Sequence, residues 1–277
     1  MSRAYRHSLN GSRLAAGELQ LELRDVSLAF GGVKALDGVS FELRQGDVHA
    51  VIGPNGAGKT SLLNCVSGLY RPQRGSIRLH TGSGPRELTR MRTSRIAQLG
   101  VARSFQNIEL FKHMTVLENL MLGRHVHMHH GVLPALVYFG PARRQEIAHR
   151  EVVEEVIDLL EIEAVRKKPV GSLAYGVQKR VELGRALCME PAVLLLDEPM
   201  AGMNAEEKED MARYVLDVNE QAGVTTVLIE HDMSVVMDVS DRVTVLDFGK
   251  VIADGTPAEV SGDPNVVQAY LGEPASA

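Results

Sequence analysis

The chain has 277 residues, of which 44% are hydrophobic, and its 35 acidic side chains against 30 basic ones give a formal net charge of −5. This mildly acidic balance argues against a protein that holds the phosphate backbone of nucleic acids on a broad basic face. Aromatic residues make up 4% of the chain and tryptophan is absent, so the composition indicates no stacking platform for bases. It is typical of an α/β enzyme with one large or two modest domains.

The sequence also bounds the membrane and redox context of the protein. The longest apolar stretch, residues 132–139, contains a proline and is far shorter than the roughly 20 residues that a helix needs to cross a bilayer. Residues 1–18 carry arginines but no apolar core of a secretory signal, so we expect a loose tail there. Cys65 and Cys188 lie in apolar helical patterns, which predicts reduced, buried thiols and no disulfide.

The first part of the chain predicts strands, then a glycine-rich loop and a helix. Residues 19–30 alternate apolar and polar side chains, which predicts a half-buried strand, and a second short strand fits residues 39–43. Residues 48–52 form a nearly continuous apolar run, typical of a parallel strand that is covered on both faces. Apolar spacing predicts a helix over residues 59–68. Residues 75–95 predict a hairpin and a loop that leads to a short helix.

Beyond Gln106 the pattern becomes helical. Residues 115–122 and 143–160 carry apolar side chains three and four positions apart, which predicts two helices. One buried stripe is predicted on the second helix, formed by Ile147, Val153, Val156, Ile157 and Leu160. The stretch therefore predicts a helical insertion between strand-forming regions.

From residue 192 the alternation of strands and helices resumes. Asn204, with Glu207 three residues later, predicts a capping box at the start of a long helix. The strands are predicted at 193–196, 225–229 and 242–246, and the helices at 205–221 and 233–239.

The most specific motif is the segment GPNGAGKT at residues 53–60, which has the P-loop spacing. Glycines let successive backbone N–H groups turn toward phosphate oxygens, and the helix N-terminus adds partial positive charge. Lys59 is predicted to reach the β- and γ-phosphates, and the Thr60 hydroxyl to hold Mg²⁺. The segment follows the strand at 48–52 and opens a helix, an arrangement that favours a P-loop over a flexible glycine turn.

Two further polar segments follow predicted strands. Asp197 and Glu198 end the apolar run at 193–196, which places them at the carboxyl edge of a parallel sheet, where ligands of such folds bind. Asp197 fits the Walker B role of holding Mg²⁺, and Glu198 is placed to polarise an attacking water. Taken alone, such a strand end is most often structural, but the P-loop reverses that interpretation. His231 follows the strand at 225–229 and reaches the γ-phosphate if the two strands are neighbours.

The order and spacing of these motifs resemble the ATP-binding-cassette (ABC) family of ATPases. The P-loop, Q-loop, signature, Walker B pair and H-loop of that family match GPNGAGKT at 53–60, RSFQ at 103–106, LAYGVQ at 173–178, Asp197-Glu198 and His231. The resemblance covers nearly the whole chain from residue 19. More narrowly, the ATP-binding subunits of branched-chain amino acid importers are similar in RSFQ, TVLENL at 115–120, LAYG, IEHDM at 229–233 and AYLG at 269–272.

The resemblance implies an α/β fold class: a RecA-like P-loop NTPase core with an antiparallel β subdomain and an inserted α-helical subdomain. The expected boundaries are a flexible tail at 1–18, the nucleotide-binding core with its β subdomain at 19–106 and 172–250, the helical subdomain at 107–171, and a C-terminal segment at 251–277.

The resemblance also implies that two cassettes face head to tail, with each ATP between the P-loop of one copy and the signature of the other. Phe30 would stack on adenine, although by itself it fits a core residue equally well. The implied nucleotide contacts are Phe30, Asn55, Gly56, Ala57, Gly58, Lys59, Thr60, Ser61, Tyr175, Gly176 and Gln178. The implied catalytic residues are Lys59, Gln106, Glu198 and His231, and the implied Mg²⁺ ligands are Thr60, Gln106 and Asp197.

The expected function is that of the ATP-binding and ATP-hydrolysing subunit of an importer for a small polar solute, with branched-chain amino acids as the expected cargo. The implied partners are a second ABC ATPase subunit, either the same or a paralogue, two transmembrane permease subunits and, indirectly, an extracytoplasmic solute-binding protein, at the cytoplasmic face of the membrane. The residues after Gln106 would meet a coupling helix of the permease. Alternatives are the ATPase of an exporter or lipid extractor, or a soluble ABC ATPase that acts on nucleic acid or ribosomes. Proteins of the last kind typically carry two cassettes or a long coiled coil, and this sequence has one P-loop and no sustained heptads.

Three features depart from the family pattern or stay open. The usual signature serine is replaced in LAYGV, so the contact to the partner's ATP is left open between backbone N–H groups, Tyr175 and Gln178. The D-loop aspartate position holds Asn204, whose role is open between a helix cap and a contact across the dimer. A solvated loop is favoured over a metal site for the histidines at positions 125, 127, 129 and 130.

Overall fold

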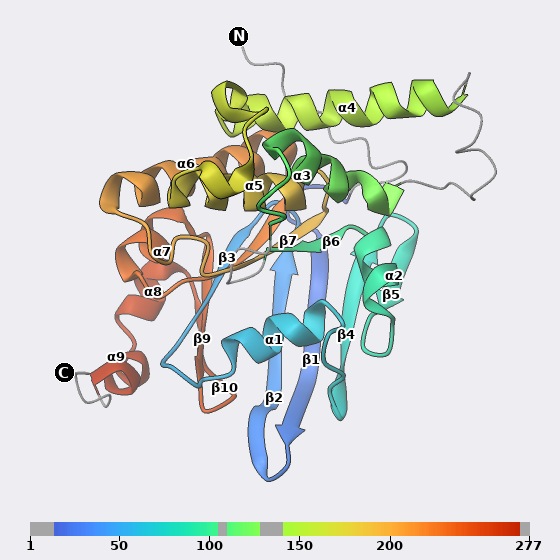
Figure 1. Cartoon of the computed structure of the whole chain (residues 1–277). Coiled ribbons are helices and arrows are strands. Elements are labelled where there is room, and N and C mark those ends of the chain that lie inside the picture. The colour runs from blue at the N-terminus through green and yellow to red at the C-terminus, as the bar shows by residue number, and fades with distance from the viewer. Residues whose placement is uncertain (1–13, 105–109, 128–140, 272–277) are drawn as a thin grey trace.

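The computed structural model describes residues 14–104, 110–127 and 141–271 of the chain. The smaller of its two sheets is antiparallel and has the strand order β2-β1-β4-β5 (Figure 1). Its strands are β1 (Leu19–Phe30), β2 (Val33–Arg44), β4 (Arg74–Thr81) and β5 (Gly84–Glu87). The structure confirms the strand predicted at 19–30. The strand predicted at 39–43 begins earlier, at Val33, because the turn at Gly31 and Gly32 folds residues 33–38 back onto β1.

The larger sheet has six strands in the order β10-β9-β3-β8-β7-β6. These are β3 (Val48–Ile52), β6 (Val101–Arg103), β7 (Val193–Asp197), β8 (Thr225–Ile229), β9 (Arg242–Asp247) and β10 (Lys250–Gly255). All neighbours are parallel except β10, which pairs antiparallel with β9. Every residue of β3, β7 and β8 is buried, which confirms the doubly covered strand predicted at residues 48–52. The carboxyl ends of five strands therefore meet at one edge.

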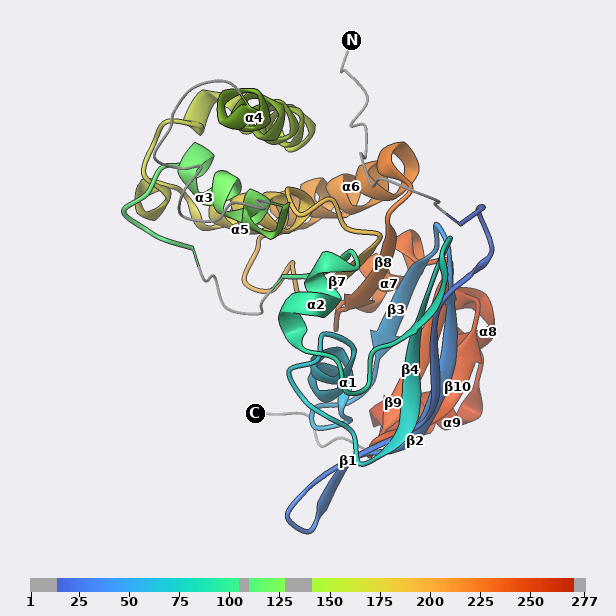
Figure 2. The same cartoon turned by 90° about the vertical axis from the view of Figure 1, so that its right-hand side faces the viewer.

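The helices form three groups around the large sheet (Figures 1 and 2). Alternate residues of β7 face different cores: Val193 and Leu195 pack with α1 and the antiparallel sheet, and Leu194 and Leu196 pack with α3, α4, α5 and α6. A third core joins α7, α8 and α9 to β3 and β9. The helices are α1 (Lys59–Val66), α2 (Thr93–Gln98), α3 (Val116–Gly123), α4 (Pro141–Leu159), α5 (Tyr175–Leu187), α6 (Ala205–Ala222), α7 (Met233–Val239), α8 (Pro257–Ser261) and α9 (Pro264–Leu271). Short 3-10 turns lie at Arg124–His127, Glu163–Val165 and Val170–Ser172.

One predicted member of the buried stripe on α4 is wrong. Val153, Val156, Ile157 and Leu160 are fully buried, but Ile147 is 50% exposed. With 3.6 residues per turn, Ile147 lies about 120° around the helix from Val153, outside the buried face. His149 lies within that face and is buried instead.

Two other sequence predictions can be compared with the structure. Cys65 and Cys188 are both buried and form no disulfide, as predicted. Within the described residues, no helix is both long enough and apolar enough to cross a membrane.

Candidate active site

Four segments that carry chemistry leave the large sheet at its carboxyl edge. The P-loop follows β3, the Asp197-Glu198 pair ends β7, His231 follows β8, and Arg103 ends β6. The register places Ile229 of β8 opposite both Val51 of β3 and Asp197 of β7. The strands that lead to Asp197 and His231 are therefore neighbours, as the sequence analysis supposed, and β8 lies between the Walker B strand and the P-loop strand.

The P-loop folds as a tight cradle at the start of α1. Gly58 has a φ of 103°, and a Cβ there would lie 2.3 Å from the carbonyl oxygen of Ala35, so only glycine fits. No side-chain hydrogen bond caps α1 at this residue, so the N–H groups of its first turn remain available within the loop. The Lys59 ammonium donates to the carbonyl oxygens of Gly53 at 2.5 Å and Pro54 at 2.9 Å. The geometry suits a phosphate group held by backbone N–H groups and one lysine.

Asp197 is almost completely buried at the end of β7. Its Oδ2 accepts a hydrogen bond from Nη2 of Arg103 at 2.8 Å, whereas its Oδ1 has no hydrogen-bond partner among the described residues. Burial raises the pKa of Asp197, and the neighbouring Arg103 guanidinium and Thr60 hydroxyl act in the opposite direction. A buried carboxylate oxygen without a partner, next to a threonine hydroxyl, is a donor set that Mg²⁺ accepts.

Glu198 directly follows this carboxylate in an unusual backbone conformation. Its φ is +49°, a left-handed value that non-glycine residues rarely adopt and that is frequent at functional sites. The backbone N–H of Glu198 donates to the carbonyl oxygen of Ile229 at 2.9 Å, which fixes the chain to the end of β8. The chain therefore leaves the strand at Glu198, at the sheet edge where the P-loop also begins.

His231 has an exposed side chain, and the loop that carries it is held by the buried residue that precedes it. The His231 side chain is 65% exposed, whereas the carboxylate of the preceding Glu230 is buried. Glu230 accepts hydrogen bonds from the backbone N–H of Met200 at 2.8 Å and of His231 at 3.3 Å. Burial raises the pKa of Glu230, and these two hydrogen bonds act against that rise. Glu230 thus ties the His231 loop to the segment that follows the Walker B pair.

A second contact supports the same loop. The Lys208 ammonium on α6 donates to Oδ2 of Asp232 at 2.7 Å, and this pairing lowers the pKa of Asp232 to about 2. The loop is therefore attached to α6 as well as to Met200.

The signature residues contact the D-loop and α6 of their own chain. The Tyr175 hydroxyl donates to the carbonyl oxygen of Ala201 at 3.2 Å, and the Gln178 amide donates to the carbonyl oxygen of Leu173 at 2.8 Å. Gly176 is buried so closely against Glu207 that a Cβ would lie 2.4 Å from its carboxylate. No side chain caps α5 at Ala174, so the first turn of the helix presents its backbone N–H groups.

Asn204 acts as a helix cap in this structure. Its side chain accepts a hydrogen bond from the Glu207 N–H at 2.9 Å, and the Glu207 carboxylate accepts one from the Asn204 N–H at 3.1 Å. The predicted capping box is therefore confirmed.

The family and the relatives that this chain matches agree with the geometry of the site. A family model described as "ABC transporter" matches residues 36–201. The chain belongs to the ABC transporter family. A second model, described as "Branched-chain amino acid ATP-binding cassette transporter", matches residues 250–276. As a member of this family the cassette is an ATP-binding ATPase, and its predicted α/β, RecA-like ABC fold is confirmed.

The cassette is similar over almost its full length to named relatives. It is 39% identical over 253 residues to the high-affinity branched-chain amino acid transport ATP-binding protein BraF of Pseudomonas aeruginosa. The aligned residues cover 91% of this chain and 98% of that protein. It is 35% identical to LivG of Escherichia coli, with the same coverage. Among solved structures, the ADP conformation of MJ1267, an ATP-binding cassette of an ABC transporter, matches with a TM-score of 0.79 and 31% identity, over 92% of this chain and 100% of that one.

Three further predictions concern Phe30, Gln106 and the histidines at positions 125, 127, 129 and 130. Phe30 is 48% exposed and its ring meets the edge of Tyr70 at 5.1 Å, so the alternative of a core residue is wrong. Gln106 lies outside the described residues. Of the four histidines, His129 and His130 also lie outside them, and the described residues contain no group of metal ligands.

The solvated-loop interpretation holds for only one of the two described histidines. His125 is exposed in the 3-10 turn after α3, but His127 is half-buried there, and its Nε2 lies 2.8 Å from the carbonyl oxygen of Met189. His127 is therefore partly buried against the residues that follow α5, which corrects the prediction of a solvated loop at this position.

Sequence reasoning did not assign roles to Arg103 and Glu230, although both lie inside segments that carried the family resemblance. Arg103 belongs to RSFQ and Glu230 to IEHDM. The signal in each case was the position within such a segment, because Glu230 directly precedes His231 and Arg103 lies three residues before Gln106.

Proposed function

We propose that this cassette is the ATP-hydrolysing subunit of an importer whose cargo is a branched-chain amino acid. The printed names of BraF and LivG, and the separate match over residues 250–276, support this cargo class. The observation that carries the hydrolytic part is the placement of Asp197, Glu198 and His231 on adjoining strand ends beside the P-loop.

Each residue at the sheet edge has a separate role in the proposed hydrolysis of ATP. Lys59 and the P-loop backbone bind the β- and γ-phosphates, and Glu198 accepts the proton of the attacking water. His231 contacts the γ-phosphate from the end of β8. Thr60 and Asp197 would hold Mg²⁺, together with Gln106, and the ion would neutralise charge on the terminal phosphates. The unpartnered Oδ1 of Asp197 fits this role.

We further propose that two cassettes close head to tail around two ATP molecules. The side chains of Tyr175 and Gln178 already donate within their own chain, which favours the backbone N–H groups at the start of α5 as the contact to the partner's γ-phosphate. Closure is driven by the higher affinity of the closed form for ATP, and hydrolysis resets it.

The implied partners define how the cassette acts at the membrane. The second cassette is an identical copy or a paralogue, and two permease subunits and an extracytoplasmic binding protein complete the importer. We assign residues 19–106 and 172–250 to the nucleotide core and residues 107–171 to the helical subdomain that meets the permease. With these partners, we expect the cassette to act at the cytoplasmic face of the membrane.

A single substitution tests the hydrolytic assignment. Glu198→Gln removes the base but leaves the P-loop, so the variant is expected to bind ATP and to accumulate as a dimer in size-exclusion chromatography. Lys59→Ala is the matched control and is expected to stay monomeric with ATP. Turnover of Glu198→Gln at the rate of the unchanged protein would rule out Glu198 as the base.

The cargo is tested separately, in vesicles that contain the cassette with its permeases and its binding protein. ATP-dependent uptake of leucine, isoleucine or valine into the compartment that holds ATP is the expected result. Movement of solute out of that compartment would instead indicate an exporter, without affecting the assignment of Glu198.

A further inference from the structure

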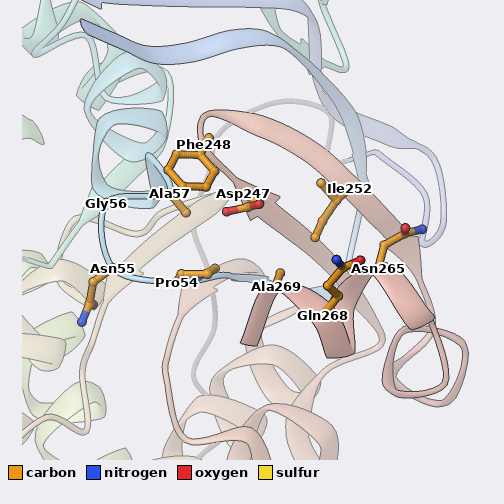
Figure 3. Close-up of a pocket in the computed structure, with 10 residues that line it drawn as sticks. All are labelled: Pro54, Asn55, Gly56, Ala57, Asp247, Phe248, Ile252, Asn265, Gln268 and Ala269. Carbon is orange, nitrogen blue, oxygen red and sulfur yellow. The ribbon is translucent and has the colours of Figure 1, made fainter. Parts of the chain in front are cut away.

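A cavity of about 540 Å³ lies between the P-loop and the C-terminal helix (Figure 3). One wall is formed by residues 54–57 of the P-loop, and another by Asp247 and Phe248 at the turn between β9 and β10. Ile252 of β10 and one flank of α9 close the remaining sides. The volume accommodates a small organic molecule.

The cavity shares residues 55–57 with the implied nucleotide contacts but lacks the side chains that are proposed to bind phosphate and Mg²⁺. Its lining includes neither Lys59 nor Thr60 nor Asp197. It is nevertheless attached to the P-loop, because the backbone N–H of Gly249 donates to the carbonyl oxygen of Ala57 at 3.0 Å. The opposite wall is formed by Ile252, Asn265, Gln268 and Ala269, which belong to the segment that is matched by its own family model.

The charge of the cavity comes from one residue. Among the described residues that line the cavity, Asp247 has the only charged side chain, and Figure 3 shows its carboxylate directed into the space. The Asp247 side chain is partly buried, and it forms no hydrogen bond or ion pair with any residue in the described part of the chain. A partly desolvated carboxylate without a counter-charge attracts a cation.

The other walls supply an aromatic ring, amides and apolar surface. Phe248 is 83% exposed and holds a left-handed φ of 41°, so the turn presents its ring instead of burying it. On α9, Asn265 and Gln268 lie on the flank that lines the cavity, and the small side chain of Ala269 leaves the space open. The apolar face of the same helix packs into the third core through Val266.

We propose that this cavity binds a small organic cation, namely a primary ammonium group on a short apolar or aromatic tail. The ammonium would pair with Asp247 and lie against the Phe248 ring, because a cation is attracted both to a carboxylate and to an aromatic face. The amide oxygens of Asn265 and Gln268 would accept further N–H donors. The tail would contact Ile252 and Ala269. This inference does not depend on the proposed cargo or on the assignment of Glu198.

The test is a titration of the full chain with three probes that differ mainly in charge, followed by calorimetry or protein NMR. The probes are the cation phenethylammonium, the neutral 2-phenylethanol and the anion 3-phenylpropanoate. Phenethylammonium is expected to bind with a dissociation constant in the millimolar range, as is usual for a ligand of this size. The alcohol and the carboxylate are expected to bind at least tenfold more weakly. Equal affinities for the three probes would overturn the proposal.

Two variants locate the binding in this cavity. Asp247→Asn is expected to weaken phenethylammonium binding at least tenfold, and Ala269→Leu, which fills the space, to abolish it. Asp238→Asn is the matched control, because it removes an exposed carboxylate of α7 that does not line the cavity. Circular dichroism before titration verifies that each variant is folded. Retained binding in folded Asp247→Asn would contradict the assignment.

A last measurement separates the cavity from the nucleotide site. The affinity for phenethylammonium is measured at increasing ADP concentrations. Two distinct sites give an effect of ADP that levels off at a constant ratio, because coupling between separate sites is finite. An apparent dissociation constant that rises without limit in proportion to ADP would show that the two ligands share one site, which would overturn the proposal.

Discussion

The ion pair between Arg103 and Asp197 joins the strand before the Q-loop to the Walker B carboxylate, and its removal has a predictable cost. The two side chains are 2.8 Å apart, with exposed fractions of 9% and 1%. Arg103→Met leaves the Asp197 carboxylate buried without its partner. Breaking such a pair from one side destabilises a protein by about 3 to 5 kcal/mol, a large part of the 5 to 15 kcal/mol that is typical of folded domains.

A double-mutant cycle separates the pair from general damage. We expect Arg103→Met and Asp197→Asn each to lower the free energy of unfolding, and the double variant to be more stable than the sum of the two losses predicts, because it leaves no buried charge unpaired. Urea unfolding followed by circular dichroism measures the effect, since the chain has no tryptophan. A coupling energy below about 0.5 kcal/mol would refute a stabilising role for the pair.

Three further predictions concern positioning, pH and thiol chemistry. Glu230→Leu removes the acceptor that holds the His231 loop and is expected to lower kcat about 10²-fold with little change in ATP affinity. Glu230→Gln keeps an acceptor oxygen and is expected to lower kcat less. Steady-state kinetics and nucleotide-binding measurements check this, and an equal loss of kcat in both variants would contradict it. Burial lowers the pKa of His49 to about 4 from an ordinary value of 6.5. As pH falls, the unfolded chain therefore takes up this proton before the folded protein does. The contribution of neutral His49 to the free energy of unfolding is fully present above about pH 6.5 and is lost progressively toward pH 4, by up to about 3 kcal/mol. The free energy of unfolding should depend less on pH in His49→Gln over this range, and an unchanged dependence would disprove the assignment. Burial also raises the pKa of the Cys65 thiol to about 12 and that of Cys188 above its usual range, so neither is expected to react with a thiol reagent until the protein is unfolded, and rapid modification of the native protein would show that one is accessible.

The local sequence pattern predicted the strands and helices that have strong periodicity or a defined start. Strands were predicted at 48–52, from a nearly continuous apolar run, and at 225–229, and both form buried parallel strands with those bounds. Asn204 and Glu207 lie three residues apart, and a capping box depends only on neighbours in sequence. The strand β6 escaped prediction because three residues are too few to show a period.

The sequence by itself determined the chemistry of this protein: a P-loop, a pair of carboxylates after an apolar run, and a histidine after the next one, in an order that indicates an ABC cassette. These are properties of contiguous residues, in which spacing along the chain sets the geometry. Only the tertiary structure decided that Arg103 pairs with Asp197, 94 residues away, that Glu230 holds the loop of His231 to Met200, and that α9 closes a cavity beside the P-loop. Such contacts depend on which strands become neighbours and which helix face is buried, and packing of the whole chain determines both.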